Sequence, residues 1–232
     1  MSIEVHVDRG VTTLTLARPA RANAYDRASL EALDAGIASV DTPTIVIQSA
    51  GERAFCGGAD LAELRAARPG DALDLYSQAV FERLAAHGAV SIAAVQGPAV
   101  AGGCELALAC DLRVAGPRAT FSLPETTLGL LPSAGGTTRL ADLVGHGRAR
   151  EVILGGRVVD AETALAWGLT SRIAVDPRAD ARGWAQQIAT RDPLALRLAK
   201  AVLDARQARG AGLALERATE AVLYASRDRT ED

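Results

Sequence analysis

The stretch "VQGPAVAGGCELALACD", Val95–Asp111, leads from an apolar segment through a glycine pair into an almost wholly apolar helix. Gly102-Gly103 opens this predicted helix, and Glu105 lies in its first turn. Burial of an unpaired carboxylate is costly. Glu105 therefore indicates a functional group, an internal ion pair with an arginine such as Arg113 or Arg139, or a side chain exposed to solvent.

The glycines of this stretch fit neither of the common nucleotide-binding loops. A P-loop needs lysine followed by serine or threonine after its last glycine, and here Cys104 follows Gly103. The spacing of Gly97, Gly102 and Gly103 also differs from the dinucleotide fingerprint. Glycines at a helix start let the backbone approach a ligand and present free N–H groups that suit a developing negative oxygen. Close packing of the helix against a neighbour is the alternative explanation.

A second glycine turn, "ERAFCGGADL" (Glu52–Leu61), follows the predicted strand "TIVIQSA" (Thr44–Ala50). Ligands of α/β proteins lie beyond the carboxyl ends of the strands, so we expect Gly57-Gly58 to offer another backbone N–H to the same cleft. An oxyanion hole commonly has two donors on separate segments. Two glycine turns after two buried strands together predict such a hole.

A second carboxylate, Glu125, lies in "FSLPETTLG" (Phe121–Gly129), just after another predicted strand. The same alternatives hold for it as for Glu105: an internal ion pair or exposure. If both carboxylates face one cleft, burial and mutual repulsion oppose two charges there. We then expect one acid to be protonated while the other stays ionised, which is the arrangement that acid/base catalysis needs.

The composition excludes several classes of protein. The 232 residues are 49% hydrophobic and 23% charged, as in ordinary globular proteins, and a net charge of −3 argues against nucleic acid as a partner. The sequence contains neither a secretory leader pattern nor an apolar run of the ~18 residues that a transmembrane helix needs. Three cysteines without metal-ligand spacing and three scattered histidines predict no metal site. We expect a reduced, cytoplasmic α/β protein that does not enter a membrane.

Strands and helices are predicted to alternate up to about residue 175, and helices alone follow. Strands are expected at 3–7, 11–16, 44–48, 92–96 and 120–123. Helices are expected at 27–39, 72–86, 104–109, 136–144, 148–154, 179–191, 192–210 and 213–228. The predicted division is a core with the site at residues 1–175 and a helical C-terminal region at residues 176–232. A parallel or mixed sheet is the expected frame of the core.

The chain resembles the crotonase (enoyl-CoA hydratase/isomerase) superfamily over nearly its whole length. The two glycine turns and "FSLPETTLGLLPSAGGTTRL" (Phe121–Leu140) match it in order. Further matching segments are "RPARANA" (Arg18–Ala24), "GRVVDAETALAWGLTSRI" (Gly156–Ile173) and "DPLALRLAK" (Asp192–Lys200). The resemblance implies a crotonase-like spiral of repeated ββα units, followed by a C-terminal helical region that builds a homotrimer, or a hexamer of paired trimers.

The resemblance also implies an activity, the reversible hydration of a 2-enoyl-CoA to a 3-hydroxyacyl-CoA. An enzyme of this kind is a hydro-lyase with a coenzyme A thioester as substrate and no prosthetic group. Glu105 is expected to activate the water that adds at C3, and Glu125 to deliver a proton to C2. The N–H groups of Gly57 and Gly102 are expected to form the oxyanion hole for the thioester carbonyl.

Other matching positions are expected to bind coenzyme A or to shape the acyl pocket. Arg21 is the expected partner of a CoA phosphate, and Leu130 with Leu131 is expected to line the acyl pocket. The remaining expected substrate-binding residues are Ala24, Ala54, Cys56, Gly58, Ala59, Asp60, Leu61, Pro124 and Gly129.

Two alternative functions stay open at this point. One is an enoyl-CoA double-bond isomerase, for which an acid at the Glu125 position can suffice. The other is a non-catalytic CoA-binding or accessory homologue. The second is suggested by the sequence end "SRDRTED", where many relatives continue into another helix that helps to cover the CoA or the acyl group. We therefore expect the C-terminal region to lack the family's usual last helix.

Overall fold

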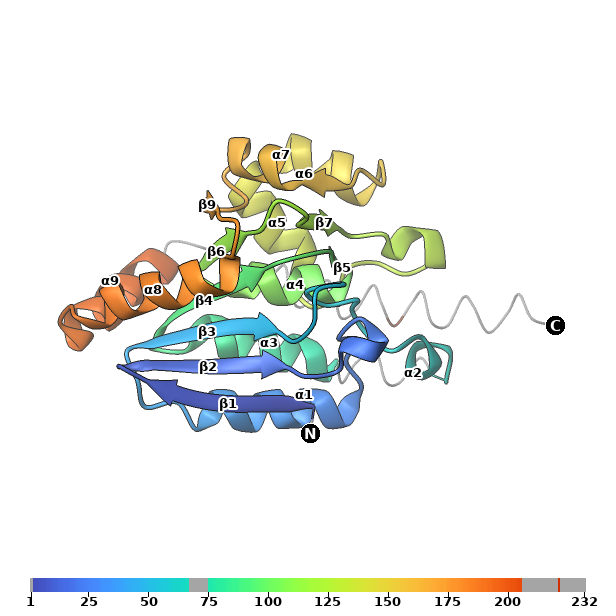
Figure 1. The fold of residues 1–232 in the computed structure, drawn as a ribbon. Helices are drawn as coiled ribbons and strands as arrows, with labels where there is room; N and C mark the ends of the chain where they lie inside the picture. Colours follow the sequence, from blue (N-terminus) through green and yellow to red (C-terminus); the bar gives the residue numbers. More distant parts are fainter. Residues whose placement is uncertain (1, 67–74, 206–220, 222–232) are drawn as a thin grey trace.

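The computed structural model describes residues 2–66, 75–205 and 221, and Figure 1 labels its elements. Its larger sheet has the strand order β1-β2-β3-β4-β6-β9. The bounds of these strands are β1 Ile3–Asp8, β2 Val11–Leu16, β3 Thr44–Ser49, β4 Val90–Val95, β6 Leu112–Ala115 and β9 Arg172–Ile173. The β1–β2 hairpin is antiparallel, and every later pair in this sheet is parallel. The sheet is therefore mixed, as the alternation of strands and helices predicts.

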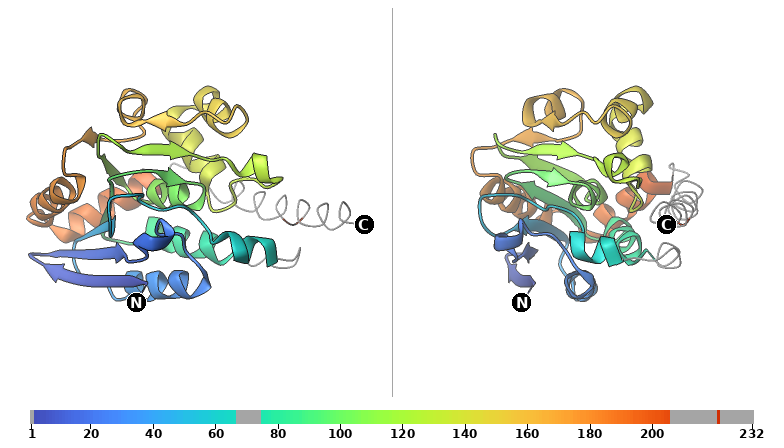
Figure 2. Two further views of the ribbon diagram at one scale, coloured as in Figure 1. Left: turned by 45° about the vertical axis from the view of Figure 1, so that its right-hand side comes forward. Right: turned by 90° about the vertical axis from the view of Figure 1, so that its right-hand side faces the viewer.

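A smaller sheet lies beyond the carboxyl ends of these strands and has the order β5-β7-β8. Its strands are β5 Ala99–Val100, β7 Thr120–Ser122 and β8 Val159–Asp160. β5 pairs with β7 in parallel, and β7 pairs with β8 antiparallel. Figure 2 shows the chain rising from the N-terminal hairpin through both sheets to α6 and α7 at the opposite end of the molecule.

Helices cover both faces of the larger sheet (Figure 1). Their bounds are α1 Arg27–Ala38, α2 Leu61–Ala66, α3 Tyr76–Ala86, α4 Gly102–Ala109, α5 Gly136–Val144, α6 His146–Ile153, α7 Ala161–Ala166, α8 Pro177–Ala189 and α9 Pro193–Ala205. Two short 3-10 helices are η1 Pro19–Arg21 and η3 Glu125–Leu128. On one face α1, α3, α4 and α5 pack in series, and on the other face α8 packs on β3, β4 and β6. Among the helices described, none combines the length and apolar character needed to cross a membrane.

The core consists of the apolar side chains that the periodicity of each element brings to the sheet. Leu14 and Ile47, paired on neighbouring strands, are fully buried under the helices of the first face. The opposite face of the same strands packs on Ala181, Ala185 and Ile188 of α8. Full burial of such a side chain stabilises the fold by about 1.5–3 kcal/mol. Both faces of the sheet are thus packed against helices. The predicted division at residue 175 falls just before α8.

The longer elements lie where the sequence predicts them, and the shortest elements were missed. β5, β8 and β9 have two residues each. β6 contains a buried arginine, Arg113, in the middle of its apolar residues. Such segments carry too little alternation to be recognised, and so do the six-residue helices α2 and α7. The predicted helical residues 72–74, 206–210 and 213–228, apart from residue 221, lie outside the described part of the chain.

Both glycine turns leave the larger sheet at the same edge. β3 and β4 are parallel neighbours, so their carboxyl ends, Ser49 and Val95, lie at one edge of the sheet. The first turn follows β3, and the second turn follows β4 through β5 into α4. This is the place at which open α/β sheets bind ligands.

Candidate active site

A cavity of about 430 Å³ lies where the two glycine turns meet. The start of α4, the first glycine turn, and η3 with the segment after it supply most of its lining. The lining residues are Tyr25, Gly57, Ala59, Leu64, Leu75, Ser77, Val100, Ala101, Gly102, Glu105, Pro124, Glu125, Thr127, Leu128, Leu130, Leu131 and Ser133. The lining is mostly apolar with a few polar groups, as is typical of a small-molecule site.

Residues 54–60 of the first glycine turn, which we call the strap, run between two other segments and are hydrogen-bonded to both. On one side the N–H groups of Phe55 and Cys56 donate to the carbonyl of Pro98. On the other side the Gly57 N–H donates to the carbonyl of Ala22 at 2.9 Å. The structure therefore corrects the role expected for Gly57, because an N–H already bonded inside the protein cannot serve an oxyanion.

The N–H that the strap turns to the cavity belongs to Ala59. Tyr25 pairs with the strap in parallel, accepting from Asp60 at 2.8 Å and donating to the Gly58 carbonyl at 2.9 Å. In such a bridge the N–H of the residue between them points to the other side. Within residues 2–66 and 75–205, no acceptor bonds to the Ala59 N–H. Ala59 was expected only as a substrate contact, and the structure makes it the available donor.

The second donor is the N–H of Gly102, the first residue of α4. The first N–H groups of a helix have no partner within the helix, and the helix dipole adds positive charge there. The preceding residue, Ala101, has φ 52° and ψ −125° and caps the helix with no side-chain hydrogen bond. A side chain on Gly58 would place its Cβ 3.2 Å from the Gly102 nitrogen. The strap and the helix start are therefore in close contact, which brings both donors to one cavity.

Each glycine of the pair has a separate reason to lack a side chain. A methyl group on Gly102 would overlap the Tyr25 hydroxyl, and one on Gly103 would overlap the Cys56 carbonyl. Gly103 thus permits the close packing of α4 on the strap, and Gly102 keeps the cavity open. Close packing, the alternative explanation for the pair, therefore holds at both positions, and Gly102 in addition lines the cavity.

Glu105 is 4% exposed, which rules out exposure to solvent, and its carboxylate caps the next helix. Its Oε1 accepts from the Ala134 N–H at 2.7 Å and from the Gly136 N–H at 2.9 Å, at the start of α5. Because two backbone donors hold one oxygen, the carboxylate has a fixed orientation beside the cavity. A side chain on Gly136 would bring its Cβ within 2.9 Å of that oxygen, so glycine is needed there.

The arginines considered as partners of the acids are engaged elsewhere. Arg113 donates to four backbone carbonyls around the end of α4, including Cys110 at 2.7 Å and Leu169 at 2.6 Å. Arg139 pairs with Glu82 at 2.6 Å and donates to the Ala134 carbonyl at 2.8 Å. Burial lowers the pKa of the Arg113 guanidinium, and these carbonyls satisfy its donors.

Glu125 begins η3 and lines the cavity together with Gly57 and Ala59 of the strap. It is 8% exposed, so exposure is ruled out for this acid as well. Its backbone carbonyl accepts from the Leu130 N–H at 3.0 Å, and Gly129 ends η3 with φ 69°. This closed turn directs the acid and Leu130 into the same cavity. Both carboxylates and both available N–H groups therefore lie around one space.

Tyr25 is a cavity residue that the sequence reasoning missed. Its ring packs edge-to-face on Phe81, with centroids 5.8 Å apart. Burial raises the pKa of its hydroxyl well above the ordinary value, and the negative charge of Glu105 raises it further. The hydroxyl is therefore a protonated donor near the two acids. The sequence feature that could have pointed to Tyr25 is its position directly after "RPARANA", a segment that was matched to the family without regard to this tyrosine.

The other expected residues fall into three groups. Pro124, Leu130 and Leu131 line the cavity as expected, and Leu64 joins them. Ala54 and Cys56 are buried residues of the strap itself, and Gly58 and Gly129 have positive φ values that permit tight turns. Three further positions are chain neighbours of lining residues and are called the rim here: Asp60 follows Ala59, Ala24 precedes Tyr25 and its carbonyl accepts from Arg18, and Leu61 begins α2.

The rim also carries an ion pair between two of the expected CoA-binding residues. The Arg21 guanidinium lies 3.1 Å from the Asp60 carboxylate, and the Arg21 side chain is 65% exposed. The Asp60 side chain is only 13% exposed, so the exposed guanidinium is the half of this pair that an anion from solvent can reach. Among the residues described, no cluster of histidine, cysteine, aspartate or glutamate suits a metal ion.

Comparisons with known proteins show the family to which the chain is similar. The family profile described as "Enoyl-CoA hydratase/isomerase" matches residues 6–232. A similar protein is the 2,3-dehydroadipyl-CoA hydratase of Escherichia coli, which is 40% identical over 95% of this chain and 89% of its own length. The short-chain-enoyl-CoA hydratase of Clostridium acetobutylicum is 34% identical over 84% of this chain and 77% of its own length.

A crystal structure gives the same result for the fold. The enoyl-CoA hydratase of Bacillus anthracis superposes with a TM-score of 0.84 at 34% identity, over 97% of this chain and 90% of that one. Both the fold expected from the resemblance and the resemblance itself are thereby confirmed.

Proposed function

The chain belongs to the enoyl-CoA hydratase/isomerase family, and from this premise we propose that its cavity hydrates a 2-enoyl-CoA to a 3-hydroxyacyl-CoA, reversibly, by means of Glu105, Glu125 and two backbone N–H groups. The observation that carries the proposal is that all four groups line one mostly apolar cavity. The activity is that of a hydro-lyase with a coenzyme A thioester as substrate.

The N–H groups of Ala59 and Gly102 are the proposed oxyanion hole. Addition of water at C3 moves the π electrons toward the thioester carbonyl, so negative charge develops on its oxygen. Two donors that are already in place stabilise this enolate without reorganisation. The positive end of α4 lies behind the Gly102 N–H and favours the same charge.

Glu105 is the proposed base for the attacking water. Its Oε1 is fixed by two N–H groups, and this keeps the carboxylate from turning away from the substrate. As the water oxygen bonds to C3, its proton passes to this carboxylate. The fixed orientation matters because a positioned base within hydrogen-bond reach is effective, whereas a mobile one is not.

Glu125 is the proposed acid that protonates C2. It belongs to η3 and Glu105 to α4, so water and proton arrive from carboxylates on separate elements. One C–O bond and one C–H bond form while one O–H bond of the water and the C2–C3 π bond are lost, so the reaction balances with no redox change. The two acids exchange roles in the dehydration direction, as microscopic reversibility requires.

The rest of the cavity is the proposed binding site for the acyl chain and for coenzyme A. Leu64, Leu130 and Leu131 give it an apolar end that suits an alkyl group. Arg21 at the rim is the proposed contact for a CoA phosphate, with Asp60 as its partner in the free protein.

A homotrimer or hexamer in the cytoplasm is a further part of the proposal. In α9 an apolar stripe at intervals of four residues, Leu194, Leu198 and Val202, is 53–62% exposed. Such a stripe favours contact with another subunit. All three cysteines are free thiols, which agrees with a reducing compartment.

The test is the loss of absorbance of the conjugated thioester when a short, a medium and a long 2-enoyl-CoA are each mixed with the protein. We expect a steady fall with at least one chain length and formation of the 3-hydroxy product. With a 3-enoyl-CoA, a rise in conjugation without uptake of water would instead favour the isomerase. Tight binding of every acyl-CoA with no turnover would favour the accessory homologue.

A further inference from the structure

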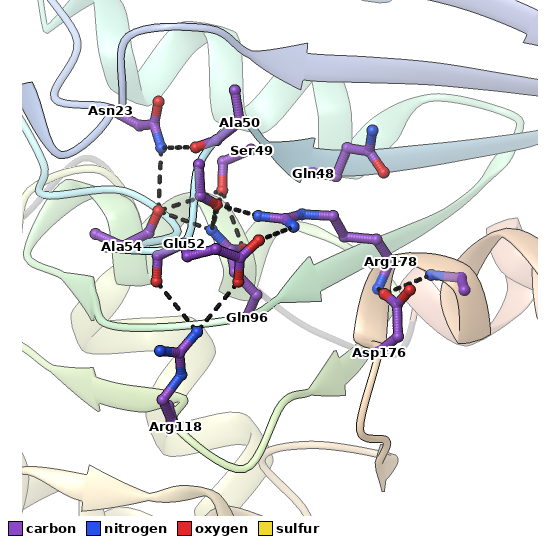
Figure 3. A network of polar contacts seen from close by, with 12 residues as sticks. Asn23, Gln48, Ser49, Ala50, Glu52, Ala54, Gln96, Arg118, Asp176 and Arg178 are labelled. Atoms are coloured by element: carbon purple, nitrogen blue, oxygen red, sulfur yellow. Dashed lines mark hydrogen bonds and ion pairs between the residues drawn. The ribbon is translucent and has the colours of Figure 1, made fainter. Parts of the chain in front are cut away.

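One carbonyl oxygen of the strap lies within hydrogen-bond distance of three side chains. The carbonyl of Ala54 accepts from Asn23 Nδ2 at 3.0 Å and from Gln96 Nε2 at 2.8 Å. Ser49 Oγ lies 3.4 Å from the same carbonyl and 3.1 Å from Gln96 Oε1, and its single proton can serve only one of these acceptors. Figure 3 shows the three side chains converging on this atom from separate segments. The two amide donors already match the two lone pairs of the carbonyl oxygen, which indicates a tightly held position.

The three side chains are buried, and two of them, Gln96 and Ser49, are bonded to each other. Asn23 is 3% exposed, Gln96 is 4% exposed and Ser49 is 1% exposed. Gln96 Nε2 also donates to Ser49 Oγ at 2.8 Å, and Asn23 Nδ2 also donates to the Ala50 carbonyl at 3.0 Å. Hydrogen bonds in such a dry interior are strong, and loss of one partner leaves the others unsatisfied. We name Asn23, Ser49 and Gln96 the amide clamp.

The amide clamp connects the end of the sheet to the start of the strap. Ser49 ends β3 and Gln96 follows β4, so two of its members are fixed by the sheet. Ala54 is the residue from which the strap leads to Ala59. Asn23 bonds Ala50 and Ala54, which are the two ends of the intervening loop, and so holds that loop closed.

Asn23 also belongs to the segment that pairs with the strap. Its own carbonyl accepts from the Cys56 thiol at 3.2 Å, and the carbonyl of its neighbour Ala22 accepts from Gly57 at 2.9 Å. Asn23 has φ 54°, a left-handed conformation that asparagine tolerates better than most residues. The conformation turns its amide toward the loop while its backbone stays beside the strap.

From these contacts we propose that Asn23 and Gln96 are positioning residues that set the place of the Ala59 N–H in the oxyanion hole. They do so by fixing the Ala54 carbonyl. The proposal rests on the proposed function, because it concerns the hole that polarises the thioester. A displacement of about 1 Å at a catalytic group can lower a rate by about a hundredfold, so a change at this distance from the cavity is expected to be visible.

The same loop carries a second polar network, which lies at the surface. Glu52 pairs with Arg118 at 3.1 Å and with Arg178 at 2.6 Å, and its side chain is 66% exposed. Figure 3 shows these ion pairs on the outer side of the loop. Exposed ion pairs are screened by solvent and contribute little. The outer network therefore serves as a comparison for the inner one.

The experiment replaces clamp amides by carboxyl groups of the same size. Gln96→Glu and Asn23→Asp remove the donor that faces the Ala54 carbonyl, and Ser49→Ala removes the longest bond with little change in volume. Matched controls are Gln48→Glu, the same substitution on the same sheet at a half-buried position bonded to Thr15 and Arg182, and Glu52→Gln in the outer network.

Two readouts separate positioning from folding. The first is kcat against KM for hydration. The second is the absorbance shift of a bound aryl-substituted enoyl-CoA, whose band moves to longer wavelength when hydrogen bonds polarise its carbonyl. We expect Gln96→Glu and Asn23→Asp to lower kcat about tenfold to a hundredfold, with KM within about threefold of wild type and a smaller shift. Ser49→Ala is expected to give the same change in weaker form, and the controls to match wild type.

Folded clamp variants with wild-type kcat and an undiminished shift would overturn the proposal. The proposal would also be overturned if the lower rate of a clamp variant came only from a smaller fraction of protein able to bind the chromophore, with kcat per binding site equal to that of the wild type. If Gln96→Glu and Asn23→Asp do not fold, Ser49→Ala decides by the same two readouts. A wild-type protein that binds the chromophore without any shift would instead refute the oxyanion hole, and with it the proposed function.

Discussion

Replacement of Glu105 by glutamine separates the chemistry of this acid from its structural role. Glutamine keeps an oxygen that can accept from the Ala134 and Gly136 N–H groups, now 2.7 and 2.9 Å from Oε1. Two charge-assisted bonds become neutral ones, which costs about 1 kcal/mol each, and the relief of a buried charge offsets part of that loss. We expect a net loss of about 1 kcal/mol, or a fall in Tm of about 2–4 °C.

Activity is expected to fall far more than stability in the same variant. A positioned general base contributes about 10²–10⁴ to the rate, so kcat of Glu105→Gln should fall by that factor. KM should change little, because the amide alters neither the Ala59 nor the Gly102 N–H. Glu105→Ala, in contrast, leaves two buried N–H groups without this acceptor, which costs about 1–3 kcal/mol each, so this variant should lose stability as well.

The assay is the loss of absorbance of a 2-enoyl-CoA, with thermal unfolding followed on the same preparations. A Glu105→Gln variant that hydrates the substrate within about twofold of the wild-type rate would refute the role of this acid. A variant as unstable as Glu105→Ala would refute the account of its hydrogen bonds.

Three further predictions concern the cavity, the thiols and a helix cap. Gly102→Ala should lower kcat about 10²–10³-fold, because its methyl group overlaps the Tyr25 hydroxyl. Adding Tyr25→Phe removes that hydroxyl and should recover part of the rate. Equal rates for the single and the double variant would contradict the overlap as the cause. Burial raises the pKa of Cys56 to about 12 and also raises those of the other two thiols, so at about pH 8 alkylation should label none in the native protein and all three after unfolding. Asp26 caps α1, and bonds from Ser29 chiefly hold its pKa below the ordinary value; Asp26→Ala should cost about 1–2 kcal/mol at neutral pH. A group with a lowered folded-state pKa stabilises fully above its unfolded value of about 3.9 and loses that contribution as the pH falls through the folded value; unfolding curves of the two proteins should therefore converge as the pH falls below about 4, and a constant difference would contradict the assignment.

The sequence predicts the frame of the site well because that frame depends on local patterns. The strands that end at Ser49 and Val95 are apolar and β-branched, and the glycine turns follow them directly. Glu105 and Glu125 were recognised because carboxylates in apolar surroundings are unusual. Their arrangement around one cavity agrees with the condition set for acid/base chemistry.

The assignment of the first donor failed because the direction of an N–H depends on pairing between distant segments. Gly57 and Ala59 are both next to Gly58, and nothing in the sequence reveals that Ala22 takes the Gly57 N–H. The amide clamp is hidden for the same reason, since Asn23 and Gln96 are 73 residues apart yet bond one atom. Tyr25 was missed because a single aromatic residue carries no periodic signal.

The most direct test of the central claim is hydration in isotopically labelled water, with the product analysed by mass spectrometry. We predict that the wild-type protein converts a 2-enoyl-CoA to a 3-hydroxyacyl-CoA that carries one labelled oxygen at C3, and that Glu105→Gln forms this product at least about a hundredfold more slowly. A protein that binds short, medium and long 2-enoyl-CoAs without adding labelled oxygen to any of them would contradict the account.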